Sequence, residues 1–181
     1  LARSIVASAE GQRWFDESRA LTLEGAIVGD PALSLAELAV RAGEPPPLRC
    51  SDLTLYERGV DCFEAILAAI EGARDHVHLE YYIFEEGKLA DRLRDALLRK
   101  ASEGVEVRLL IDGLGSRALS WRFISSLREG GVQVATFNPM FLASFRPPRL
   151  NFRSHRKIVC VDGNLAFVGG MNVHDEQDES V

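Results

Sequence analysis

A short group of polar residues near the end of this 181-residue chain has side-chain types and a spacing that could do chemistry. The pattern reads H-x-K-x4-D-x6-G-G-x-N, and its members are His155, Lys157, Asp162, Gly169, Gly170 and Asn172. Six specified positions at about one in twenty each, tried along the whole chain, give a chance match on the order of 10⁻⁶. The full pattern is therefore a strong signal, whereas a lone His-x-Lys would carry none.

The residue types suit phosphoryl transfer. An imidazole can attack or protonate a phosphodiester, and a cation can stabilise its oxygens. His155 and Lys157 are two residues apart, so their side chains project to the same side of an extended chain. Glycine at 169 and 170 allows backbone to approach a ligand closely. These four positions predict a phosphate site.

The two other members of the pattern invite separate interpretations. Asn172 can donate to phosphate through its amide, and with Asp175 three residues later it is a candidate N-cap for a helix whose N-terminus would face the phosphate. Asp162 completes the motif of catalytic residues. It lies five residues after Lys157, on the opposite side of an extended chain, and opens an Asp-Gly turn, so we favour a structural role for it.

The surrounding chain alternates helix-like and strand-like segments. Apolar periodicity predicts helices over 60–74, 89–101 and 120–129, and strands over 77–84, 105–112, 132–137, 157–162 and 165–168. Alternation of strands and helices predicts a sheet with helices packed on it. The Asp-Gly turn between the last two strands predicts a hairpin. We therefore expect an α/β fold with a mixed, mostly parallel sheet that closes with a C-terminal hairpin.

The first 47 residues are expected to form an appendage. Residues 33–42 carry a helical apolar stripe, and the Pro-rich run 45–47 suggests a linker to one domain over 48–181. The longest uncharged stretch, 130–145, falls short of the ~18 apolar residues of a spanning helix, so we expect no membrane crossing. The chain starts at Leu1 without a signal-peptide pattern, which suggests a trimmed chain.

Composition narrows the choice of partner and compartment. The chain has 27 acidic and 21 basic residues, a net charge of −6, which disfavours general nucleic-acid binding. One stretch, 146–157, holds five cations and no acid and could still attract a phosphate. Three cysteines without a C-x-x-C pair predict reduced thiols and a cytosolic setting. No histidine spacing suggests a zinc site, so we expect no metal site. We expect no cofactor.

Three further features are candidates for the site. Asp112 and Ser116 flank the end of a predicted parallel strand, the usual edge for sites in such sheets, although a turn explains them equally well. Glu80 is an acid within an apolar strand and would need a partner, for which Arg108 and Lys157 are candidates. The apolar loop 140–145 could rest at a bilayer interface or fold onto another part of the protein.

The motif resembles that of the phospholipase D superfamily. Beyond the motif, the chain from about residue 53 to 176 resembles the first half of a bacterial cardiolipin synthase. The resemblance lies in the segments 78–84, 104–116, 131–139 and 154–159, which include His-Leu-Glu-Tyr-Tyr-Ile-Phe and Ser-His-Arg-Lys-Ile-Val. It implies a phospholipase D-like half.

In that superfamily two His-x-Lys motifs meet at one active site, and no metal is needed. One histidine attacks phosphorus to give a phosphohistidine, while the other protonates the leaving alcohol. The resemblance implies that His155 is the nucleophile, that Lys157 and Asn172 bind phosphate, and that an orienting carboxylate lies beyond Val181. No other histidine is followed by lysine two residues later, so we expect half of a site and a fragment of a longer protein.

The leading functional hypothesis is a phosphatidyltransferase that moves a phosphatidyl group between two phosphatidylglycerol molecules. It would act in the cytoplasm, peripherally at the inner membrane surface, with a second half from the same longer chain or from a homodimer mate. The candidate substrate-binding residues are Asn172, Gly170, Gly169, Ser116 and Glu80. Two alternatives remain open: a phospholipase D-like phosphodiesterase or dimeric nuclease, and a non-catalytic lipid-binding half.

Overall fold

The computed structural model describes residues 38, 40–42, 51–139 and 153–178. The chain divides into two compact units, Leu1–Leu55 and Tyr56–Val181. The predicted linker at 45–47, the loop at 140–145 and most of the predicted helix at 33–42 lie outside the described residues. The boundary expected after residue 47 therefore stays a prediction.

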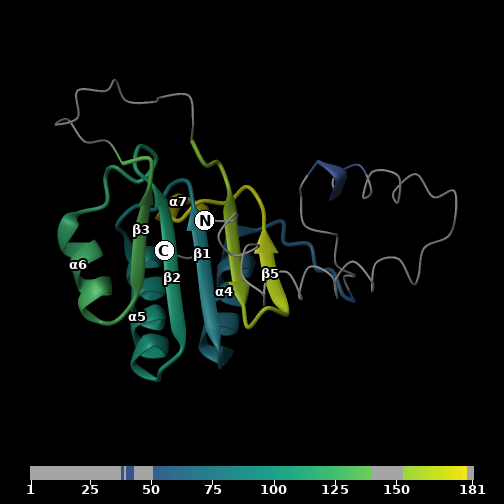
Figure 1. The fold of residues 1–181 in the computed structure, drawn as a ribbon, viewed down its shortest axis with the longest axis horizontal. Coiled ribbons are helices and arrows are strands. Elements are labelled where there is room, and N and C mark those ends of the chain that lie inside the picture. Colours follow the sequence, from purple (N-terminus) through teal and green to yellow (C-terminus); the bar gives the residue numbers. More distant parts are fainter. Residues whose placement is uncertain (1–37, 39, 43–50, 140–152, 179–181) are drawn as a thin grey trace, which may run out of the picture. The chain divides into compact units, whose positions relative to one another are not determined.

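The second unit is built on a five-stranded sheet with the order β3-β2-β1-β4-β5 (Figure 1). Its strands are β1 (His76–Tyr81), β2 (Glu106–Asp112), β3 (Gln133–Phe137), β4 (Lys157–Val161) and β5 (Leu165–Val168). β1 pairs in parallel with β2 and β2 with β3, whereas β4 is antiparallel to both β1 and β5. Four strands thus share one direction, and the mixed, mostly parallel sheet with a C-terminal hairpin is confirmed.

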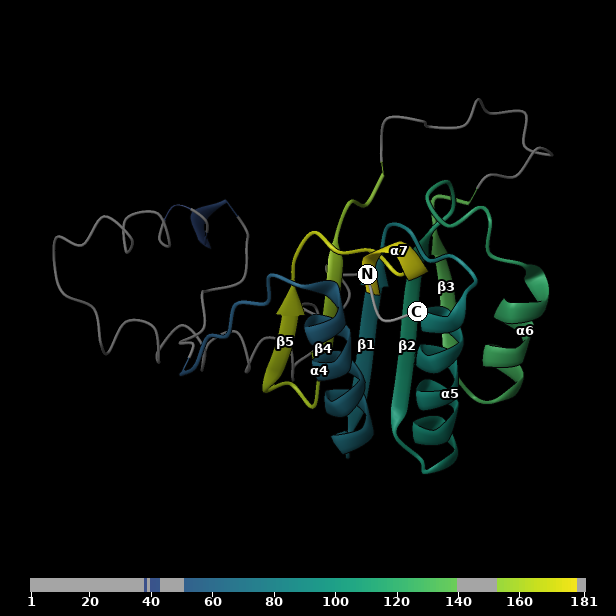
Figure 2. The same ribbon diagram turned by 180° about the vertical axis from the view of Figure 1, so that it is seen from behind.

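Helices pack against this sheet. They are α4 (Gly59–Gly72), α5 (Lys88–Ser102) and α6 (Trp121–Glu129). The short α7 (Asp175–Asp178) packs against α4 and α5. The long helices α4 and α5 lie behind the sheet in Figure 1 and in front of it in Figure 2, so both cover the same face. No helix among the described residues is long and apolar enough to cross a bilayer.

The alternation within β1 shows why this face is the core. Val77, Leu79 and Tyr81 are buried, whereas the intervening residues, including His78 and Glu80, are partly exposed. Successive strand residues point to opposite faces, so one face receives every apolar side chain. The buried set packs with helix residues of the same cluster, such as Phe63, Ile70, Leu93 and Leu97. Truncating one of these leucines to alanine costs about 2–5 kcal/mol of stability.

Two strand boundaries matter for the site. The hairpin between β4 and β5 turns at Asp162 and Gly163, whose φ values of 50° and 68° are left-handed, as this tight turn requires. β1 ends at Tyr81, three residues before the predicted end at Phe84. The backbone of Phe84 is bonded by Ser116 and bridges to Val173 instead. Tyr82 therefore lies outside β1, directly after its last residue.

Candidate active site

One edge of the sheet gathers most of the predicted site residues. The carboxyl ends of β1, β2 and β3 meet there with the start of β4 and the end of β5, because β4 alone runs in the opposite direction. We call this the site edge and define it by Tyr81, Asp112, Phe137, Lys157 and Val168, the terminal residues of the five strands. The opposite edge, which holds the Asp162 turn, is called the turn edge.

His155 and Lys157 lie together at the site edge. Lys157 begins β4 opposite Tyr81, and exposed His155 lies two residues before it. The Lys157 Nζ donates to the carbonyl oxygen of His155 at 2.8 Å. Both side chains meet the ring of Tyr82: the imidazole centroid lies 4.0 Å from the phenol centroid at 31°, and Lys157 Nζ lies 5.3 Å from it. The motif's first two members therefore share one aromatic neighbour.

The segment after β5 returns to the same edge. Gly169 N–H donates to the Lys157 carbonyl at 3.3 Å, and Val173 N–H donates to the Ile83 carbonyl at 3.1 Å. Between them, the Asn172 side-chain oxygen accepts from Ile83 N–H at 3.2 Å. A Cβ at Gly169 or at Gly170 would meet no heavy atom within 4 Å. Packing thus leaves open space at both glycines, where a phosphate could approach.

The predicted capping of a helix by Asn172 is wrong. Its oxygen is committed to Ile83, and α7 is only four residues long, too short for a helix N-terminus to bind phosphate. Asp175 instead caps α5 from a distance, because its carboxylate accepts from Lys88 N–H at 3.1 Å and Leu89 N–H at 3.0 Å. These bonds, chiefly that from Leu89, lower the pKa of the Asp175 carboxyl. Asp175 therefore links the C-terminal segment to the start of α5.

Glu80 does not pair with either predicted partner. Its carboxylate accepts from the Ser154 hydroxyl, and Arg156 Nη1 lies 4.0 Å from its Oε2. Arg108 instead contacts Glu106 at 2.9 Å, a neighbour on its own strand, and Lys157 turns to the His155 carbonyl. We therefore assign Glu80 to holding the chain just before His155 rather than to substrate binding.

Asp112 holds the same stretch of chain from a buried position. Its Oδ1 accepts from Leu114 N–H at 2.8 Å and Gly115 N–H at 3.0 Å, which closes the turn after β2. Arg153 Nη1 lies 3.5 Å from Oδ1, and Ser154 N–H donates to Oδ2 at 3.3 Å. The sequence left open whether Asp112 serves a turn or the site. In the structure one carboxylate does both: it closes the turn, and it holds the residues that precede His155.

Ser116 is too buried to contact substrate. Only 5% of the residue is exposed, and its hydroxyl donates to the Tyr82 carbonyl at 3.1 Å and accepts from Phe84 N–H at 3.0 Å. Beside it, Gly115 lies so close that a Cβ would be 2.2 Å from the Tyr82 carbonyl oxygen. The expected substrate contact of Ser116 is therefore replaced by support of the chain at Tyr82.

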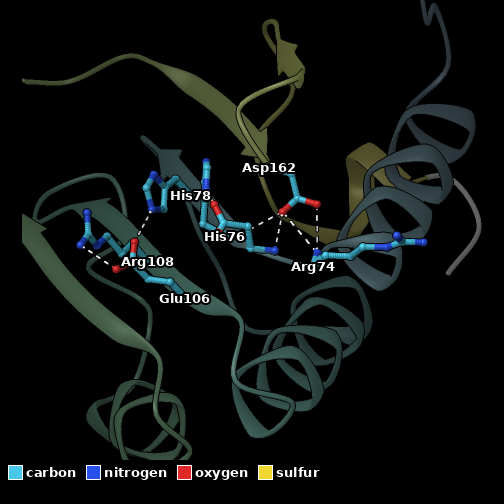
Figure 3. Close-up of polar contacts among 7 residues, drawn as sticks. Arg74, His76, His78, Glu106, Arg108 and Asp162 are labelled. Atoms are coloured by element: carbon cyan, nitrogen blue, oxygen red, sulfur yellow. Dashed lines mark hydrogen bonds and ion pairs between the residues drawn. The ribbon is translucent and has the colours of Figure 1, made fainter. Parts of the chain in front are cut away.

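Asp162 lies at the turn edge, separated from Lys157 by the length of β4, and Figure 3 shows it beside the chain at Arg74 and His76. Its carboxylate accepts from the backbone N–H groups of Arg74 and Asp75, both at 2.9 Å, and of His76 at 3.0 Å. These bonds, with Asp75 the largest contributor, lower the pKa of the Asp162 carboxyl. The geometry fits the structural role that its position in the motif suggested, and we do not retain it among the catalytic residues.

His76 and His78 also occupy this part of the sheet, each beside a carboxylate (Figure 3 shows the His78 contact). His76 Nδ1 lies 2.8 Å from Asp75, and His78 Nε2 lies 3.0 Å from Glu106. Across the described ranges, no group of three or more histidine, cysteine or acidic residues could hold a metal ion.

Sequence reasoning missed Tyr82 and Ser154. Tyr82 follows the last strand residue and is one of two adjacent tyrosines, a position that gives no signal of contact with residue 155. Ser154 directly precedes the motif histidine. Its hydroxyl could have suggested a bond to a nearby acid, but only the pairing of β1 with β4 brings Glu80 within reach.

Comparison with known proteins places these features in a family. The family described as "Cardiolipin synthase, PLD-like domain" matches residues 66–178. Cardiolipin synthase 1 of Bacillus anthracis is 40% identical over 161 residues, 88% of this chain and 31% of the relative. The major cardiolipin synthase of Bacillus subtilis is 50% identical over 118 residues, 65% of this chain and 24% of the relative. The chain thus spans about a third or less of these relatives.

A solved structure supports the fold alone. NucT from Helicobacter pylori superposes with a TM-score of 0.52 at 18% sequence identity, over 71% of this chain and 77% of that one.

Proposed function

Because this chain belongs to the family of cardiolipin synthase, phospholipase D-like domains, we propose that it supplies one half of a phosphatidyltransferase active site. The observation that carries the proposal is the meeting of His155, Lys157 and Asn172 at one open edge of the sheet. A single imidazole can attack phosphorus but cannot protonate the leaving alcohol at the same time, so a second acid–base group is needed, and we assign that role to the histidine of a second motif.

In the first step a ring nitrogen of His155 attacks the phosphorus of phosphatidylglycerol. The bond between phosphorus and the head-group glycerol oxygen breaks, and a phosphatidyl group stays on the imidazole. The histidine of the second motif gives its proton to the departing glycerol oxygen. Free glycerol leaves the site.

In the second step another phosphatidylglycerol enters as the acceptor. Its terminal hydroxyl passes a proton to the second histidine while its oxygen attacks phosphorus. The bond between phosphorus and His155 breaks, which restores the imidazole and yields cardiolipin. If water takes the acceptor's place, the product is phosphatidic acid.

Lys157 and the 169–172 segment stabilise the charge that builds on the phosphoryl oxygens. The Lys157 ammonium supplies a fixed cation beside the imidazole, and the backbone at the two open glycines lets the phosphate come close. The amide NH₂ of Asn172, which no described residue bonds, is a further donor, since its oxygen is oriented by Ile83.

The remaining parts of the proposal concern partners and place. The second half comes from the same longer chain or from a homodimer mate, and nucleic acid is disfavoured by the net charge of −6. The substrate is a membrane lipid, so the site edge works peripherally at the inner membrane surface. Cys62 and Cys160 are free thiols, which suits a cytoplasmic setting.

The test is to incubate the protein, together with its second half, with vesicles of head-group-labelled and acyl-labelled phosphatidylglycerol. Cardiolipin and glycerol in equal amounts support transfer. Phosphatidic acid with glycerol and no cardiolipin supports the hydrolytic alternative. Vesicles that bind protein but stay unchanged support a non-catalytic lipid-binding half.

A further inference from the structure

Tyr82 contacts both members of the His-x-Lys motif although it belongs to neither the motif nor the strand before it. Its ring centroid lies 4.0 Å from that of His155 at a tilt of 31°, which is stacking distance. The ammonium of Lys157 lies 5.3 Å from the same centroid, within the range of a cation–π contact. One aromatic ring therefore contacts the nucleophile and the adjacent cation.

The backbone of Tyr82 is held in place from the β2–α6 loop. Ser116 donates to its carbonyl at 3.1 Å from a buried position, and it accepts from Phe84 N–H two residues later. Gly115 packs against the same carbonyl, with room for no side chain: a Cβ would lie 2.2 Å from Tyr82 oxygen and 3.0 Å from its Cδ2. The backbone that carries the ring is therefore held in one position.

Adjacent Tyr81 makes a useful contrast. It is 3% exposed and packs edge-on against Phe84 in the core, at 6.1 Å between centroids. Tyr82 is half-buried, is absent from the core cluster, and its hydroxyl is bonded by none of the described residues. Core packing accounts for Tyr81 but not for Tyr82, whose aromatic contacts are with the two motif side chains.

We propose that Tyr82 is a positioning residue whose ring fixes the orientation of the His155 imidazole and keeps the Lys157 ammonium beside it. His155 is exposed and its backbone carbonyl is its only described polar contact, so without the ring its side chain would be free to rotate. Holding a nucleophile in its attack geometry is a large part of catalysis, and a misplacement of about 1 Å can cost on the order of 100-fold in rate. This inference rests on the proposed function.

The first arm of the test compares ring variants in the active protein. Tyr82→Leu removes the aromatic face, and we expect kcat to fall by roughly 30- to 100-fold with KM changed by less than about 3-fold, because positioning acts after binding. Tyr82→Phe keeps the face and should restore kcat to within about 3-fold of the unmodified protein. Tyr56→Leu is the matched control, a half-buried tyrosine whose ring centroid lies 6.3 Å from that of Phe167, at a tilt of 36°.

The second arm moves the ring without altering it. Gly115→Ala places a Cβ against the Tyr82 carbonyl and should lower kcat, as Tyr82→Leu does. Gly72→Ala is the control, because its Cβ would meet nothing within 4 Å, and it should leave kcat unchanged. Melting temperatures of all variants show whether the protein is folded. If Tyr82→Leu fails to fold, the Gly115 and Gly72 pair carries the test.

The third arm reads the contact itself, without activity. In the 181-residue chain, the His155 Hε1 proton should resonate upfield of its position in Tyr82→Leu, since a stacked ring shields it, and Tyr82→Phe should keep the shift. His155→Ala assigns the signal.

Three outcomes overturn the proposal: unchanged kcat in a folded Tyr82→Leu, a Tyr82→Phe variant as slow as Tyr82→Leu, or an unshifted His155 proton. The second would show that the hydroxyl, not the ring, acts. Failure of the proposed function is a separate result: His155→Ala would then retain activity, and the resonance arm would still decide whether Tyr82 holds the imidazole.

Discussion

Two polar regions lie at opposite ends of strand β4, and their side chains differ in how far backbone hydrogen bonds occupy them. At the turn edge, the Asp162 carboxylate accepts from three backbone N–H groups. At the site edge, the imidazole of His155 is exposed and lies on the Tyr82 ring. The five residues of β4 lie between His155 and Asp162, although both belong to one sequence motif.

The difference shows that a motif can join residues with separate duties. A carboxylate whose oxygens are occupied by backbone donors stabilises the fold and has little capacity left for a substrate. Polar groups at the site edge are instead held indirectly, through buried Asp112 and partly buried Glu80, which fix residues 153–154. Changes at the two edges should therefore separate activity from stability.

The largest effect is expected from His155→Ala. Loss of the nucleophile should reduce both transfer and hydrolysis to background, at least 10⁴-fold, because no phosphohistidine can form. The melting temperature should stay within about 2 °C, since the side chain is exposed. Initial rates with labelled phosphatidylglycerol measure the loss of activity, and a thermal melt measures the stability.

Lys157→Ala should have the next largest effect on rate. Removing one preorganised cation costs about 2–4 kcal/mol of barrier, or roughly 30- to 1,000-fold in kcat. Lys157→Arg keeps the charge and is the matched variant. Rates for Lys157→Ala equal to those of the unmodified protein would show that this ammonium does not stabilise the reaction.

Asp112→Asn should affect stability and activity together. The amide keeps the turn acceptor but removes the negative charge that faces the largely buried Arg153 at 3.5 Å, at a cost of about 3–5 kcal/mol in the free energy of unfolding. The residues before His155 lose an anchor, and kcat should fall by roughly 10-fold. Urea unfolding and kinetics on the same preparation test this coupling; an effect on stability alone would separate Asp112 from the site.

Asp162→Asn should act on stability and leave kcat nearly unchanged. Its amide cannot accept as strongly from three N–H groups, so we expect the melting temperature at pH 7 to fall by roughly 5 °C. At a temperature where both proteins are folded, kcat should agree within about 2-fold. A large fall in kcat without a change in the melt would move Asp162 into the catalytic machinery.

The pH dependence of that difference follows from the lowered pKa of the Asp162 carboxyl. A carboxyl with a lower pKa in the folded than in the unfolded state stabilises the protein fully above its unfolded pKa, about 4. That contribution disappears as the pH falls through the folded pKa. The gap in melting temperature between the protein and Asp162→Asn should therefore shrink below pH 4, and a gap that widens there would contradict the assignment.

Chelation should have the smallest effect. Neither edge offers a cluster of metal ligands among the described residues, and the proposed chemistry assigns its charge stabilisation to Lys157. Activity after dialysis against EDTA should match that of untreated protein. Loss that added divalent ion restores would show that the phosphate site has been wrongly interpreted.

Much of this fold could be predicted because its signals are local. Alternation in β1, the helical stripes and the Asp-Gly turn each lie within a few residues, and they predicted the mostly parallel sheet and its hairpin, though not the order of the strands. The partners of Glu80 were predicted wrongly because they depend on the register of β1 against β4, a pairing between residues some 80 positions apart that no local pattern contains.

The meeting of the motif residues at the site edge was predictable in part for the same reason. His155, Lys157 and Asn172 belong to a motif with a fixed spacing. Tyr82 contacts His155 and Lys157 from outside that motif, because β1 ends before it and Ser116 holds its carbonyl. The cap formed by Asp175 on α5 likewise joins distant segments. Contacts of this kind arise from packing and appear only once the elements are placed.

The most direct measurement of the central claim is to trap the covalent intermediate. The active protein is mixed with phosphatidylglycerol, quenched rapidly without acid and digested, and the phosphorylated peptide is sequenced by mass spectrometry. We expect the phosphatidyl group on His155, and the same yield from folded Asp162→Asn. An adduct that forms only on the histidine of the second motif, or no adduct under any condition, would contradict the account.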